Sequence, residues 1–280
     1  MPAPLYALGA IASVQLGATV ARRLFDFLGP TGTVFLRVAF GACIVLAIAR
    51  PRWPRFDARQ WRAIVLFGLI IAGMNLCFYQ AIARIPLGVA VTVEFIGPLG
   101  VAIVSSRKTL DFAWAAMAAA GVALLSFSGG AVTTLGLLFA LGAAAGWASY
   151  IVLGQRVGRL VPGADGLAFA LAVGGLALLP FGIAGGGSRL LNASNLVLGL
   201  IVAILSSAIP FSLEFAALRR LSRQAFGILM SLEPAMGAAA GFLLLGQRSS
   251  LRDLIAIGLV MVASAGATRT APPPAATDVP

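Results

Sequence analysis

Three carboxylates lie within long apolar runs of this 280-residue chain: Glu94, Glu214 and Glu233. A carboxylate surrounded by hydrocarbon is costly, so it is expected where it binds a proton or a substrate ammonium, or where it joins helices. Glu94 and Glu233 fall about halfway along their runs, which favours function. The alternative is that these two acids have a structural role and join helices, either as protonated carboxyls or paired with Arg37. Glu214 lies near the end of its run, close to arginines, which favours a structural role.

Prolines accompany these acids. Pro98 follows Glu94 by four residues and cannot donate a hydrogen bond to its carbonyl, and Pro210 and Pro234 free carbonyls one turn earlier in the same way. Backbone carbonyls without helical partners are tolerated at membrane depth when they face a cavity or another helix. The three prolines are therefore candidate hinges and sources of ligand acceptors, with a static kink as the equal alternative.

Other side chains in these runs combine an apolar body with a polar edge. They are Gln15, Asn75, Tyr79 and Trp147. The chain has no histidine, and its two cysteines, Cys43 and Cys77, form no CxxC pair. Neither a metal-ligand cluster nor a nucleophile–base pair is apparent. The sequence therefore predicts no enzyme activity, no cofactor and no metal site.

The elements that carry these residues are predicted to be transmembrane helices. Hydrophobic residues make up 60% of the chain, charged residues 10%, and the mean hydropathy is +1.00, whereas a soluble domain carries about 25% charge. Runs of about 20 apolar residues cross about 30 Å of hydrocarbon as helices. The expected fold is an all-α membrane protein with ten spans, at about 5–22, 31–49, 62–83, 87–105, 112–128, 132–154, 165–184, 195–217, 225–245 and 251–268.

The net charge of +11 is placed as a topology signal rather than as a nucleic-acid surface. With the N-terminus in the cytoplasm, 13 basic residues fall on the cytoplasmic side and 6 on the outer side. Basic residues are enriched in cytoplasmic loops. The sequence therefore predicts a multi-pass protein of the bacterial inner membrane, with both termini in the cytoplasm and no nucleic-acid partner.

The two halves of the chain resemble each other faintly. Gly88 and Glu94 recur as Gly227 and Glu233 at an offset of 139 residues. Since each half has five predicted spans, the halves enter the membrane in opposite directions, as in the inverted repeats of transporters. The expected organisation is one five-helix repeat at 1–130, a second at 131–268, and a disordered tail at 269–280.

Four segments carry a resemblance to a known family. They are IPLGVAVTVEFIGP (85–98), GWASY with GQR (146–156), ILSSAIPFSLE (204–214) and GILMSLEP (227–234). Together they resemble the EamA branch of the drug/metabolite transporter superfamily, and within it the threonine/homoserine exporter type. The related aromatic amino-acid exporters share this architecture. One departure is Gly246-Gln247, where such proteins commonly have Gly-Glu.

The resemblance implies ten helices in two inverted repeats and export of small neutral amino acids, working here by alternating access. A zwitterion needs an acceptor for its ammonium, which Glu94 would supply, and donors for its carboxylate, which Asn75 and Gln15 would supply in part. Tyr79 and Trp147 would bound the substrate side chain. We therefore expect a cavity walled by spans 3, 4, 8 and 9, with contributions from spans 1 and 6, and with Glu233 facing it.

Glu94 is also a candidate proton carrier, because a low-dielectric cavity disfavours an unpaired carboxylate. Proton coupling is thus a further expectation. The expected partners of the protein are the lipid bilayer and an amino-acid substrate. Efflux of drugs or lipophilic cations is the alternative function, since acids in a largely apolar cavity suit either kind of substrate.

Overall fold

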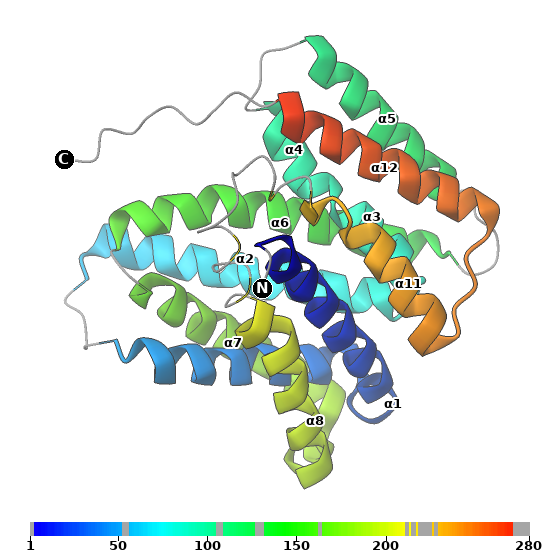
Figure 1. Cartoon of the computed structure of the whole chain (residues 1–280). Helices are drawn as coiled ribbons and strands as arrows, with labels where there is room; N and C mark the ends of the chain where they lie inside the picture. The colour runs from blue at the N-terminus through cyan, green and yellow to red at the C-terminus, as the bar shows by residue number, and fades with distance from the viewer. Residues whose placement is uncertain are drawn as a thin grey trace.

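The structure is a computed structural model that describes residues 3–51, 56–104, 109–126, 132–161, 164–210, 213, 217, 226 and 229–270. Every regular element within these ranges is helical (Figure 1). Five of the helices are long and apolar enough to cross a membrane, and shorter apolar helices accompany them. Large apolar side chains such as Leu176, Val197 and Leu243 are exposed on the outside, as lipid-facing side chains are. The chain is therefore a multi-pass helical membrane protein.

The first helix, α1 (Ala3–Ala49), consists of two legs that meet at Gly29. Gly29 has a φ of 64°, a left-handed conformation that glycine adopts without penalty, and Pro30 opens the second leg. The sequence predicted this break. The first leg, however, continues to Leu28 rather than ending at residue 22, so Arg22 lies on the helix and donates to the Ala83 carbonyl at 3.5 Å.

The rest of the first half follows the predicted spans within a few residues. Its helices are α2 (Ala58–Ile82), α3 (Leu87–Glu94), α4 (Ile96–Val104) and α5 (Thr109–Ser126). Asp57 and Gln60 form a capping box that starts α2. The break between α3 and α4 falls at Phe95, where Pro98 offers no N–H to the carbonyl of Glu94.

The second half begins with α6 (Thr134–Leu160) and α7 (Asp165–Gly186). A 3₁₀ turn, η1 (Gly187–Leu191), leads into α8 (Ala193–Ala203), which continues as a π-helical segment, η2 (Ile204–Ala208). The last helices are α11 (Glu233–Leu245) and α12 (Leu251–Thr270). The predicted breaks at 107–108, 129–130, 162–163 and 219–223 lie outside the described residues, as do Glu214 and most of the predicted tail.

Helices of opposite halves pack against each other. The pairs in contact include α1 with α7, α2 with α6, α3 with α11 and α5 with α12, and α5 and α12 run side by side at one end of the molecule (Figure 1). Small residues make these approaches close. Gly142 and Gly146 of α6 face Cys77 and Met74 of α2, which confirms that the GxxxG pattern in this helix serves packing.

Candidate functional site

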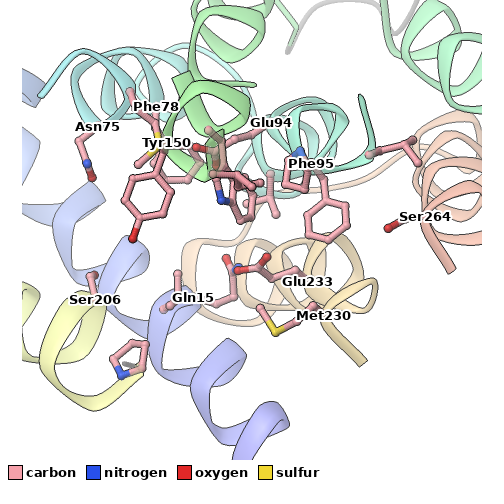
Figure 2. A pocket seen from close by; sticks show the side chains of 18 of the residues that line it. Gln15, Asn75, Phe78, Glu94, Phe95, Tyr150, Ser206, Met230, Glu233 and Ser264 are labelled. Atoms are coloured by element: carbon pink, nitrogen blue, oxygen red, sulfur yellow. The ribbon is translucent and has the colours of Figure 1, made fainter. Parts of the chain in front are cut away.

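A cavity of about 420 Å³ lies where helices of both halves converge (Figure 2). Its lining comes from α1, α2, α3, α4, α6, η2 and α12, and from the stretch that leads into α11. The residues are Val14, Gln15, Arg37, Met74, Asn75, Phe78, Val91, Glu94, Phe95, Pro98, Leu99, Trp147, Tyr150, Ile151, Ser206, Pro210, Phe226, Met230, Glu233, Ser264 and Thr268. Of the six candidate ligands and three candidate hinges named from the sequence, all but Tyr79 and Pro234 are in this list.

Glu94 and Glu233 approach the cavity from two helices that pack together. Glu94 is the last residue of α3 and Glu233 the first of α11, and Figure 2 shows both side chains at the cavity. Gln15 of α1 lies against α11, since a Cβ on Gly237 would be 3.3 Å from its Oε1 atom. One face of the cavity therefore gathers two carboxyls and an amide.

Arg37 is the cationic side chain among the described lining residues. Its Nη2 atom donates to the Ser206 carbonyl at 3.4 Å, and its guanidinium lies 5.5 Å from the centre of the Tyr79 ring. The sequence singled it out only as a partner for the acids. Its position on the second leg of α1, inside an apolar run, was the available signal for a role at the site.

The acceptor that Arg37 uses is freed by Pro210, and a local change of helix type frees a second carbonyl beside it. Pro210 has no N–H to offer the Ser206 carbonyl, and Ile209 donates to the Ile204 carbonyl, five residues back, which leaves the Leu205 carbonyl without that donor as well. Ser13 of α1 donates to the Leu205 carbonyl at 2.7 Å. Both carbonyls are thus satisfied by side chains from the other half of the chain.

Aromatic side chains form the apolar part of the wall. Trp147 meets Phe95 edge-on with ring centres 5.5 Å apart, and Tyr150 packs on Phe67 at 5.1 Å. Asn75 also lines the cavity, but its Nδ2 atom donates to the Ile71 carbonyl of its own helix at 2.8 Å. One of its two N–H groups is therefore already engaged.

One sequence expectation is corrected here. Tyr79 does not face the cavity. It is fully buried against Phe25, with ring centres 5.7 Å apart, because it lies about 100° around α2 from Phe78, which does face the cavity.

Pro234 lies where the predicted span 225–245 is interrupted. Residues 231 and 232 form a turn, and Pro234 occupies the first turn of α11, where it has no N–H to donate to the Met230 carbonyl.

The side chain of Gln247, at the Gly246-Gln247 departure, has a defined partner. Gln247 Oε1 accepts a hydrogen bond from the backbone N–H of Leu87 at 2.9 Å. It therefore caps the start of α3, whose own N-cap residue, Pro86, provides no side-chain bond. The amide joins the end of α11 to the beginning of α3, the two helices that carry the acids.

A small cavity that holds acidic and basic side chains between the helices of a multi-pass membrane protein is the kind of site that a transporter needs. Comparison with known proteins shows the class. The model of the EamA-like transporter family matches residues 1–128 and again residues 134–269. The chain therefore belongs to the EamA-like transporter family, and the resemblance drawn from the four sequence segments is confirmed.

Individual relatives are similar over nearly the whole length. The chain is 42% identical over 264 residues to the threonine/homoserine exporter RhtA of Escherichia coli (strain K12), covering 93% of this chain and 89% of that protein. Its identity to the RhtA of Salmonella typhimurium (strain LT2) is 40%, with the same coverage. A crystal structure of a protein 22% identical to this chain superposes with a TM-score of 0.62, covering 96% and 97% of the two chains, which shows the shared fold.

Proposed function

We propose that this transporter exports small amino acids, of the threonine and homoserine kind, across the bacterial inner membrane. The observation that carries the proposal is a single cavity with two carboxyls, Glu94 and Glu233, and one guanidinium, Arg37. A zwitterion is the ligand that matches charges of both signs. The curated relatives are named as threonine/homoserine exporters, which supports the same substrate class and a transport rather than an enzymatic role.

The cavity also supports some breadth of substrate. Its volume of about 420 Å³ lies within the roughly 300–1,000 Å³ range of small-molecule sites. Phe78, Phe95 and Trp147 provide an apolar wall, so aromatic amino acids belong to the proposed range. A lipophilic cation suits the cavity less well, because Arg37 would repel it.

Ten spans are part of the proposal. The two legs of α1 count as two, and α3 with α4, and α8 with η2, count as one span each. The cross-half contacts support an internal symmetry that exchanges spans 1 to 5 with spans 6 to 10. In the first half, α2 contacts α6 and α7. The matching contacts are those of α8 and η2 with the two legs of α1. The pairs α3–α11 and α5–α12 each join two helices that the symmetry exchanges, so each pair maps onto itself.

Such an arrangement suits alternating access by rocking of one repeat against the other around the central cavity. The excess of basic residues in the predicted cytoplasmic loops supports an orientation with both termini inside. The proposed substrate ligands are Glu94, Asn75, Trp147, Glu233 and Gln15. The proposed bending points are Pro98, Pro210 and Pro234.

Transport by purified protein in liposomes tests the proposal. The wild-type chain should exchange labelled threonine across the bilayer, and Glu94→Gln should lower the rate at least about tenfold, because a hydrogen bond to a charged group contributes roughly 1.5–3 kcal/mol. Asp26→Asn is the matched control, since Asp26 is exposed and does not line the cavity. Both variants should elute as single species. A wild-type rate for Glu94→Gln would remove Glu94 from the site.

Proton coupling is tested in the same liposomes. An imposed pH gradient should drive threonine movement in the wild-type protein and fail to do so in Glu94→Gln. Movement that follows the threonine gradient alone in the wild-type protein would indicate facilitated passage.

A further inference from the structure

We infer that Arg37 binds the carboxylate of the transported amino acid and thereby fixes which way the substrate lies in the cavity. The inference rests on the proposed function and adds the group that recognises one end of the substrate. Arg37 lines the main cavity and also an adjoining one of about 80 Å³, together with Asn75 and Ser206. Its side chain is therefore accessible from both spaces.

The guanidinium has donors to spare. It carries five N–H groups in a planar fork that matches a carboxylate. Its hydrogen bond to a backbone carbonyl in the described residues is the long one to Ser206, at 3.4 Å. The guanidinium carbon also lies 5.5 Å from the centre of the Tyr79 ring, within the range of a cation–π contact. Tyr79 thus orients the fork instead of lining the cavity.

No direct ion pair joins Arg37 to Glu94 among the described residues. Arg37 is half-buried within an apolar run, and a cation there is costly without a close counter-ion. A ligand carboxylate would supply that counter-ion, as a bidentate partner. An anion therefore matches Arg37 better than it matches the uncharged amides in the wall.

The polar groups that line the smaller cavity together with Arg37 lie apart from the acids. In Figure 2, two of these groups, Asn75 and Ser206, lie at one side, and Glu94 and Glu233 lie farther toward Ser264. A bound amino acid would place its carboxylate at the Arg37 side and its ammonium toward the acids. This assignment replaces Asn75 as the main carboxylate donor, since one N–H of Asn75 is held by Ile71.

The experiment compares threonine with threoninol, in which a hydroxymethyl group replaces the carboxylate. Each competes against labelled threonine in proteoliposomes, and the ratio of the two half-inhibitory concentrations is the readout. The ratio does not depend on how much protein is active. In the wild-type protein threonine should compete at least about tenfold better, since a charge-assisted, bidentate pair is lost with threoninol.

Arg37→Gln should bring the ratio close to one, and Arg37→Lys should give an intermediate value, because a lysine keeps the charge but loses the fork. Arg84→Gln is the matched control. Arg84 also stacks on an aromatic ring, that of Phe139 at 5.0 Å, and donates to a backbone carbonyl, but it does not line the cavity. Its ratio should equal that of the wild-type protein.

The outcomes separate the two proposals. A wild-type protein that does not move threonine would overturn the proposed function itself. A wild-type protein that moves threonine but binds threoninol equally well would overturn the role of Arg37 without any variant. An unchanged ratio in Arg37→Gln would do the same. If that variant does not fold, an unchanged ratio in Arg37→Lys decides against recognition of the carboxylate by the guanidinium fork.

Discussion

Gly88 of α3 lies directly against Ala238 of α11, and replacing it with alanine should separate these two acid-bearing helices. A Cβ at this position would lie 2.6 Å from the Cα atom and 2.7 Å from the Cβ atom of Ala238 in α11. Carbon atoms in contact are normally about 3.5–4.0 Å apart, so α3 and α11 must move by about 1 Å. The obstacle is backbone, which cannot turn away as a flexible side chain could.

Overpacking of this kind costs about 1–3 kcal/mol, which corresponds to a fall of several degrees in Tm. Thermal unfolding of the purified protein in detergent, followed by tryptophan fluorescence, measures it. Gly100→Ala is the matched control, because a Cβ at Gly100 would meet nothing within 4 Å, and alanine is the better helix former. Gly100→Ala should therefore leave Tm unchanged or slightly higher.

Combining Gly88→Ala with Ala238→Gly should restore part of the lost stability, since it removes one of the two close carbon contacts. If Gly88→Ala were as stable as Gly100→Ala, the close packing of α3 on α11 would not exist in the folded protein. The geometry of the acidic face, which depends on this packing, would then need revision.

Two further predictions concern the ends of the helices. Gln247→Leu should lower Tm, because the Leu87 N–H loses its acceptor at a cost of about 1–3 kcal/mol. Gln247→Glu keeps an acceptor and should have the Tm of the wild type. Equal Tm values for the two variants would contradict the proposed cap. The second prediction uses Arg59→Cys in a chain with Cys43 and Cys77 replaced by serine. The new cysteine should not react with a membrane-impermeant thiol reagent applied to whole cells, because the exposed start of α2 is predicted to face the cytoplasm. Efficient labelling of intact cells would reverse the predicted orientation.

Much of the helical framework follows from local chemistry that the sequence displays directly. Gly29 next to Pro30 gave an unambiguous break, and Pro86 marked the start of α3. An acid in an apolar run is equally conspicuous, because its cost in hydrocarbon does not depend on its neighbours. Glu94 and Glu233 could therefore be placed at the cavity before any coordinates.

Other features depend on how helices rotate about their axes, which the sequence does not display. Asn75 and Tyr79 are spaced as residues on one helical face, yet Asn75 borders the cavity while Tyr79 turns into the core against α1. The role of Arg37 was hidden for a similar reason. Pro210 indicates that the Ser206 carbonyl lacks its helical donor, but the sequence does not display that this carbonyl lies beside the second leg of α1, where Arg37 donates to it.

The π-helical segment also determines which way the residues on either side of it face. A π turn accommodates one residue more than an α turn, so it offsets the two parts of the helix by one residue, or about 100° around the axis. Before the segment, Gly199 lies against Leu36; after it, Pro210 lines the cavity. In a helix shortened by that one residue, these two positions could not both keep their partners. The extra residue is therefore the means by which one helix supports the fold with its first part and the cavity with its second.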